Sequence, residues 1–158
     1  SKGLYRVHQF SKIELFQITT PDRSEQALED ILKLEETIYQ RLGLPYRVLK
    51  ICAGDLGAAA YKKYDIEVWM PGRDSEDKYG EVTSTSNCTD FQARRLNIRY
   101  KNANNDKFFA HTLNGTAIAI SRTLMAIMEN FQDEHGAIHI PQVLVPFVGK
   151  SIITPKAP

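Results

Sequence analysis

Five side chains near the amino-terminal end of the chain could bind one small ligand. Every second residue between positions 6 and 14 is basic, acidic or aromatic, namely Arg6, His8, Phe10, Lys12 and Glu14. Because side chains alternate in a strand, all five would share one face over about 27 Å, at roughly 3.3 Å per residue. Such a face suits a ligand with a flat ring, a phosphate and an amine. The alternative is the polar outer face of an antiparallel sheet, and the pattern alone leaves both open.

Two further stretches carry side chains that could take part in binding or catalysis. Residues 79–87 combine Glu81 with an unusual number of Ser and Thr hydroxyls, which suit hydrogen bonding to a ligand or to water. Arg122 lies within the nearly apolar run 117–128, where an unpaired buried charge would be costly. It either forms a structural ion pair with a carboxylate of the sheet or reaches an anionic ligand, and the sequence favours neither.

The elements that would position these residues follow from hydrophobic periodicity. Apolar spacing between Pro21 and Gly43 predicts a helix, with acidic residues such as Glu35 mainly on its solvent side and Gly43 as its C-cap. Residues 114–116 are expected to open a second, buried helix over 117–128. A hairpin is predicted around the polar loop 102–106. Predicted strands cover 5–19, 44–52, 64–70, 79–87, 96–101, 107–113 and 136–140, followed by a largely extended tail.

The bulk properties indicate one globular α+β domain. A length of 158 residues is that of a single domain, and the short connections and hairpins favour one antiparallel sheet backed by two main helices. The net charge of +1 provides no overall field for nucleic acid, and no apolar run approaches the roughly 18 residues of a membrane span. Cys52 and Cys88 lack metal-ligand spacing, which predicts two free thiols in a reducing compartment.

Four ordered stretches resemble the class II aminoacyl-tRNA synthetases, specifically the seryl-tRNA synthetases. Residues 3–14 resemble the second half of the family's second signature motif, and residues 113–124 resemble the third motif, including its arginine, Arg122. Residues 64–72 and 81–95 are similar to the seryl pattern between those motifs. The resemblance covers essentially the whole chain, and four motifs in order are far more specific than any one of them.

The resemblance implies that residues 1–158 are the latter part of a catalytic domain. They would run from the second half of motif two, through motif three, to a carboxy-terminal tail, as an antiparallel sheet backed by helices and incomplete on its amino-terminal side. The first motif, which forms the dimer interface, and the amino-terminal tRNA-binding arm are absent from this sequence. We therefore expect this chain alone to be inactive.

The resemblance also implies a reaction and a set of site residues. Serine and ATP would form seryl-adenylate and pyrophosphate, and the seryl group would pass to the tRNA for serine. The catalytic residues would be Arg6, Glu81 and Arg122. ATP would be bound by Arg6 at the α-phosphate, the Val7 backbone, Phe10 stacked on adenine, Arg122 at the γ-phosphate, Glu81 and Ser84. Glu81 and Ser84 would hold Mg²⁺. Glu14 would hold the serine ammonium group, and Asn114 and Thr116 would line the serine pocket.

The same resemblance sets expectations for partners and for an alternative. The full-length parent would be a homodimer in the cytoplasm, with a mitochondrial location left open and no membrane association. Glu81 and Ser84 have opposite strand parity, so both can face one site only through a bulge or a strand end. The alternative is a non-catalytic synthetase-like protein that binds nucleotide or tRNA. Such a relative would be expected to lose Arg6, Glu14, Glu81 or Arg122, and all four are present.

Overall fold

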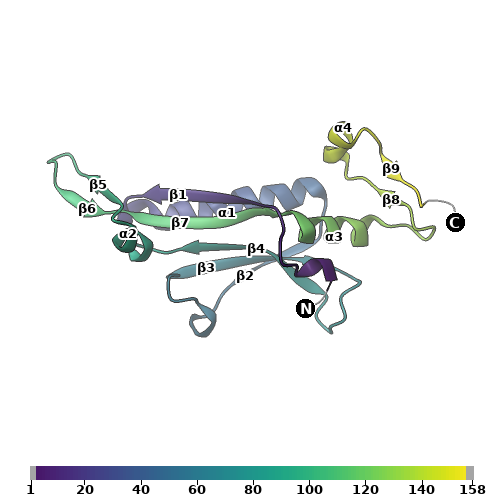
Figure 1. The fold of residues 1–158 in the computed structure, drawn as a ribbon, viewed down its shortest axis with the longest axis horizontal. Helices are drawn as coiled ribbons and strands as arrows, with labels where there is room; N and C mark the ends of the chain where they lie inside the picture. Colours follow the sequence, from purple (N-terminus) through teal and green to yellow (C-terminus); the bar gives the residue numbers. More distant parts are fainter. Residues whose placement is uncertain (1–2, 156–158) are drawn as a thin grey trace.

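A five-stranded antiparallel sheet forms the centre of the protein (Figure 1). The computed structural model describes residues 3–155. The strand order is β1-β7-β4-β3-β2, and every neighbouring pair is antiparallel, which confirms the predicted α+β class. The strands are β1 (Lys12–Thr19), β2 (Tyr46–Lys50), β3 (Lys62–Trp69), β4 (Tyr79–Asn87), β5 (Arg99–Lys101), β6 (Lys107–Phe109), β7 (His111–Ala119), β8 (Ile138–His139) and β9 (Ile152–Ile153). The α-helices are α1 (Ser24–Leu42), α2 (Phe91–Leu96), α3 (Ile120–Phe131) and α4 (Val145–Val148), and the 3-10 helices are η1 (Gly3–Tyr5), η2 (Pro21–Arg23), η3 (Ala53–Asp55) and η4 (Gln142–Leu144).

Helix α1 covers one face of the sheet and leaves the other for polar side chains. It packs against β7 and β4. Leu28 and Ile31 of α1 pack with Leu113 of β7, and Leu32 and Leu42 join the larger core cluster with residues of β3 and β4. The helix ends at Gly43 with φ 71°, as predicted from the preference of glycine for left-handed C-caps.

The first strand is shorter than predicted. β1 begins at Lys12 rather than near residue 5, because its partner β7 ends at Ala119, which is paired with Lys12. The Ile120 amide donates the last bond to Ser11 O, at 3.1 Å, and α3 begins there. Residues 6–11 are therefore not paired with another strand in the described sheet. The predicted alternation, which placed Arg6 and Phe10 on one face with Glu14, is wrong for Arg6 and Phe10.

The expected helix start at residues 114–116 is also wrong. These residues lie in β7, because the sheet surrounds them on both sides: Ser86 of β4 is paired with Asn114, and Glu14 of β1 with Thr116. A short apolar run such as 117–119 has no periodicity that separates a buried strand from a buried helix. Helix α3 starts only at Ile120 and is amphipathic, since Leu124 is 52% exposed whereas Ala126 is fully buried.

Glu35 is buried, contrary to the predicted solvent-facing position. Its side chain is completely inaccessible at the interface between α1 and the sheet. Both carboxyl oxygens lie 2.6 Å from Thr85 Oγ1 of β4. Burial raises the pKa of Glu35 to about 7, although the hydrogen bond from Thr85 works in the opposite direction.

This buried carboxyl predicts a pH-dependent stability. Its pKa lies above the ordinary value of 4.5, so the folded protein binds the proton more tightly than the unfolded chain does. The free energy of unfolding should therefore fall by roughly 3 kcal/mol from this group as the pH rises from 4.5 to above 7. Urea unfolding at pH 5 to 8 should show this loss relative to Glu35→Gln, which cannot ionise. Parallel pH profiles for the two proteins would contradict the prediction.

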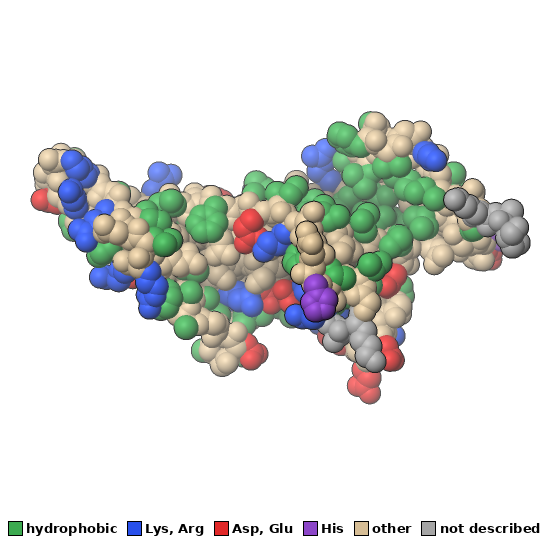
Figure 2. Space-filling view, viewed as in Figure 1, with side chains coloured by type: hydrophobic (Ala, Val, Ile, Leu, Met, Phe, Trp, Pro, Cys, Tyr) green, Lys and Arg blue, Asp and Glu red, His purple; other side chains and the backbone are tan. Residues whose placement is uncertain are grey.

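The carboxy-terminal part is more structured than the extended tail that was predicted. Residues 138–153 form η4, α4 and the small β8–β9 ribbon, while residues 156–158 lie outside the described part. Figure 2 shows hydrophobic side chains gathered around α3, α4, β8 and β9. The β5–β6 hairpin, with its loop at 102–106, is confirmed at the opposite end of the molecule. Helices in the described range 3–155 lack the combined length and hydrophobicity needed to cross a membrane.

Candidate active site

A bulge in β4 brings Glu81 and Ser84 to the same face of the sheet. Ile66 of β3 is paired with Thr83, whereas the next residue, Glu67, is paired with Glu81, so Val82 is the extra residue. Val82 and Thr83 are both buried, while Glu81 and Ser84 are partly accessible. Residues 81 and 84 have opposite strand parity, so both side chains can face one site only through such a bulge, and β4 contains it.

Arg122 and Glu81 form a compact group at one end of this polar face. Arg122 Nη1 donates to Glu81 O at 3.0 Å and lies 3.4 Å from Glu81 Oε1, and Arg122 Nε donates to Tyr5 O at 3.3 Å. The Tyr5 ring lies under the guanidinium, with its centroid 4.6 Å from Cζ, and the Tyr5 hydroxyl donates to Glu81 O at 2.8 Å. The structural ion pair considered for Arg122 is therefore present. Its contact with an anionic ligand stays a prediction.

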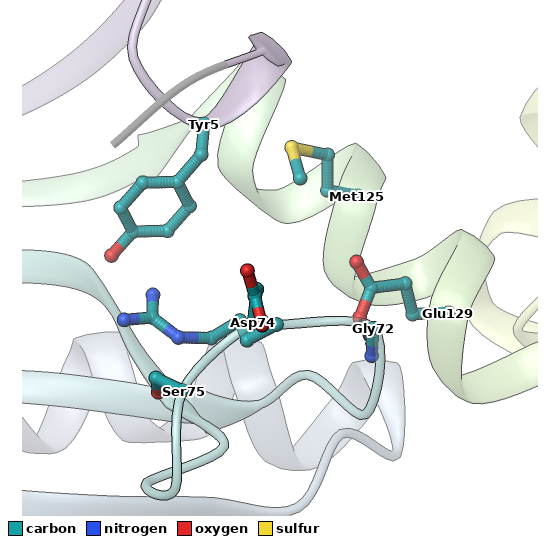
Figure 3. A pocket seen from close by; sticks show the side chains of 7 residues that line it. Tyr5, Gly72, Asp74, Ser75, Met125 and Glu129 are labelled. Atoms are coloured by element: carbon teal, nitrogen blue, oxygen red, sulfur yellow. Dashed lines mark hydrogen bonds between the residues drawn. The ribbon is translucent and has the colours of Figure 1, made fainter.

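A hollow of about 380 Å³ opens next to this group (Figure 3). Tyr5 and Met125 lie on one side of it, and the loop with Gly72, Asp74 and Ser75 lies on the other. The guanidinium of Arg73, from the same loop, stacks on Tyr5 with its Cζ 5.0 Å from the ring centroid. The Tyr5 ring thus has two cations close to it, one from α3 and one from the loop.

The second group lies where β1 is paired with β7. Asn114 Nδ2 donates to Glu14 Oε1 at 3.2 Å, and Thr116 Oγ1 donates to Glu14 Oε2 at 3.1 Å. Lys12 Nζ lies 2.8 Å from Glu14 Oε2. Burial works to raise the pKa of Glu14, but the hydrogen bonds from these three residues outweigh it and hold that pKa below its usual value. The result is an ionised carboxylate able to bind a cation.

A second hollow, of about 310 Å³, adjoins Asn114. Ser84 and Ser86 of β4 line it, together with Cys88 and Gln92. Cys88 Sγ donates to Asn114 Oδ1 at 3.7 Å, so the Asn114 amide is oriented on both sides, by Cys88 and by Glu14. Both cysteines are free thiols, as predicted, with Cys52 exposed and Cys88 buried. Hydroxyl and amide groups line this hollow, and its volume suits a small polar molecule.

The remaining predicted ATP-binding residues come from the segment before β1. Arg6 and Val7 follow Tyr5 directly in the chain, and Arg6 is exposed while Val7 is partly buried. Phe10 lies just before β1 and is 52% exposed. Their individual roles stay predictions, because the strand alternation that linked them to Glu14 does not hold.

Sequence reasoning missed Tyr5 and assigned no role to Ser86 and Cys88, which lie around Asn114. Tyr5 belongs to a 3-10 helix and contacts Arg122 only through the tertiary fold, so no local pattern could reveal it. Ser86 could have been found, because it lies two residues after Ser84 and strand alternation puts both on one face. Nothing in the sequence pointed to Cys88 as a site residue, because the two cysteines lack the spacing of metal ligands.

The residues present fit a Mg²⁺ ion that is held chiefly by phosphate. Glu81 offers one carboxylate whose side chain is 41% exposed, and Ser84 lies on the same face. Residues 3–155 contain no cluster of three or more His, Cys, Asp or Glu side chains suited to a metal. Because Mg²⁺ keeps several waters and takes one or two carboxylates in addition to phosphate oxygens, this donor set is sufficient only alongside a nucleotide.

The chain is similar to class II aminoacyl-tRNA synthetases in sequence. The family profile for the tRNA synthetase class II core domain (G, H, P, S and T) matches residues 1–131. The serine–tRNA ligase of Rubrobacter xylanophilus is 58% identical over 155 residues, which are 98% of this chain and 36% of that protein. The chain thus spans about a third of the length of this curated relative.

Solved structures give the same result. The crystal structure of seryl-tRNA synthetase from Pyrococcus horikoshii complexed with ATP has a TM-score of 0.93 and 50% identity, covering 99% of this chain and 35% of that one. The cytoplasmic serine–tRNA ligase from Naegleria fowleri in complex with AMP has a TM-score of 0.92 and 43% identity, covering 98% of this chain and 37% of that one. The chain therefore belongs to the class II tRNA synthetase core family, and within that family it resembles the seryl-tRNA synthetases.

Proposed function

We propose that the longer protein containing this chain activates serine with ATP and transfers the seryl group to the tRNA for serine. The observation that carries the proposal is the pair of groups on one polar face of the sheet. The ionised Glu14 carboxylate, hydrogen-bonded to Asn114 and Thr116, suits an ammonium group. Arg122, held beside Glu81, suits a phosphate. An amino acid and a nucleoside triphosphate are the two substrates that these groups would select.

The chemistry follows from positioning and charge. The serine carboxylate would attack the α-phosphorus of ATP, and the bond from that phosphorus to the oxygen bridging to the β-phosphate would break, releasing pyrophosphate. Arg6 would hold the α-phosphate and Arg122 the γ-phosphate, because a planar guanidinium can pair two phosphate oxygens. Such fixed charges stabilise the negative charge that spreads over the phosphate oxygens.

The other ATP contacts complete this proposal. Phe10 would stack on adenine, which is worth roughly 1–3 kcal/mol in comparable nucleic-acid contacts, and Val7 would contribute through its backbone. Glu81 and Ser84 would hold Mg²⁺, which when bound neutralises phosphate charge. The serine hydroxyl would enter the hollow beside Asn114, where alanine would leave polar groups unpaired.

The proposal also covers the oligomeric state, the tRNA partner and the cellular compartment of the whole protein. The family resemblance supports a homodimer that binds tRNA. The two free thiols, Cys52 and Cys88, support a reducing compartment, and we propose the cytoplasm.

The test is amino-acid-dependent exchange of labelled pyrophosphate into ATP by the longer protein. Exchange should require serine, and kcat/KM should be at least about 100-fold lower with alanine or threonine, because alanine leaves the hydroxyl partners unpaired and threonine adds a methyl group to a small hollow. Each amino acid should be tested at matched ATP and Mg²⁺ concentrations. Exchange that is absent, or that prefers another amino acid, would overturn the proposal.

A further inference from the structure

A buried contact lies directly behind the amino-acid half of the candidate site. Thr85 of β4 and Gly115 of β7 are register partners, and Glu35 of α1 lies against both. Thr85 and Glu35 are both completely buried. A carboxyl group at the centre of a helix–sheet interface is costly, so its retention calls for a physical reason.

Gly115 is the residue that makes room for this carboxyl. A Cβ atom at position 115 would lie 2.4 Å from Glu35 Oε1 and 2.5 Å from Thr85 Oγ1. Any side chain would therefore displace the carboxyl or separate the two strands. The fit is specific to the combination of a glycine in β7, a threonine in β4 and a glutamate in α1.

The neighbours of this contact point to the opposite face. Side chains alternate along a strand, so Asn114 and Thr116 flank Gly115 on the polar face, as Ser84 and Ser86 flank Thr85. Asn114 and Thr116 donate to Glu14, and Ser84, Ser86 and Asn114 line the adjacent hollow. A shift of Gly115 relative to Thr85 would thus change the spacing of the groups on the other side of the sheet.

We propose that Glu35 is a positioning residue for amino-acid binding, acting through Thr85 and Gly115 to set the spacing of β4 and β7 behind Glu14, Asn114 and Ser86. The inference rests on the proposed function, since it assumes that this half of the site binds the amino acid. It adds a residue on the far side of the sheet that no substrate touches.

The polar surroundings of the carboxyl agree with a neutral, hydrogen-bonded group. Its titratable neighbours are Glu14 across the sheet, Asp65 of β3 and Tyr39 on its own helix. One Thr85 hydroxyl can donate to only one carboxyl oxygen, whereas a protonated carboxyl can also donate back to Thr85 Oγ1. A protonated carboxyl could thus exchange two hydrogen bonds with Thr85, one through each oxygen.

The test compares the KM for serine, the KM for ATP and kcat between wild type and variants of the longer protein, all measured by pyrophosphate exchange. Thr85→Val removes the hydroxyl at nearly constant volume, and Glu35→Ala removes the carboxyl. Each should raise the KM for serine roughly 10-fold, with the KM for ATP and kcat within about twofold, because Arg122 and Glu81, the proposed phosphate and Mg²⁺ contacts, do not touch Glu35 or Gly115. Thr85→Ser and Glu35→Gln keep the hydrogen bond and should restore the KM for serine to within about threefold of wild type.

Leu42→Ala is the matched control for lost stability. Leu42 is a buried residue of α1 that packs in the larger core cluster, away from Gly115. Its substitution should lower the unfolding free energy without raising the KM for serine. An unchanged KM for serine in Thr85→Val, or an equal rise in Leu42→Ala, would overturn the inference. Wild-type protein without serine-dependent exchange would instead refute the proposed function itself.

Discussion

Replacing Arg122 by alanine in the longer protein is expected to slow serine-dependent pyrophosphate exchange by roughly two orders of magnitude or more. Loss of a single preorganised donor to a charged transition state typically costs about 100-fold to 1,000-fold in rate. Arg122 is oriented by the carbonyls of Tyr5 and Glu81 and by the Tyr5 ring, so the protein itself holds its guanidinium in position. The measurement is the exchange rate at saturating serine and ATP.

A control separates this effect from the general loss of a positive charge. Arg94 is an exposed arginine of α2 that pairs with Asp90 in the same helical region. Arg94→Ala removes the same charge and should leave exchange within about twofold of wild type. Normal exchange in Arg122→Ala would remove Arg122 from the set of catalytic residues, and thermal unfolding of that variant shows whether its fold is intact.

The second large effect is expected at Glu14. Substituting alanine for Glu14 should raise the KM for serine by roughly 100-fold, because a charged hydrogen bond to the ammonium group would be lost. The KM for ATP should change little, since the proposed phosphate contacts come from Arg122 and the residues around it. The measurement is the dependence of the exchange rate on serine concentration, with ATP held at saturation.

Two variants sharpen the interpretation of this result. Glu14→Gln keeps an acceptor for Asn114 and Thr116 but removes the charge, and it should still show a large rise in the KM for serine. Lys12→Ala removes the cation paired with Glu14 at 2.8 Å and should change the same constant by less than about fivefold. A Glu14→Gln enzyme with the wild-type KM for serine would show that the carboxylate charge does not hold the amino acid.

Several elements of the fold could be predicted from local sequence alone. Helix α1 was predicted from its apolar spacing, and its end from Gly43, because a left-handed C-cap depends on residues within one turn. The β5–β6 hairpin was predicted in the same way from the polar loop 102–106 between two alternating runs. The antiparallel arrangement followed from the short connections between the strands.

Other features depended on partners that are distant in the chain. The start of β1 at Lys12 is set by the end of β7 at Ala119, more than 100 positions away. The burial of Glu35 requires the missing side chain of Gly115 and the hydroxyl of Thr85. The bulge at Val82, which puts Glu81 and Ser84 on one face, arises in the pairing of β4 with β3. None of these leaves a periodic signal in the sequence.

The candidate site shows the same division. The residue types and the order of the motifs, and hence the family, could be predicted from the sequence, because motif similarity depends on identity and spacing along the chain. The contacts of Glu14 with Asn114 and Thr116, and of Arg122 with Tyr5 and Glu81, are visible only in the folded protein. These contacts join elements separated by 41 to 117 positions, and such separations are closed only by pairing and packing of the whole sheet.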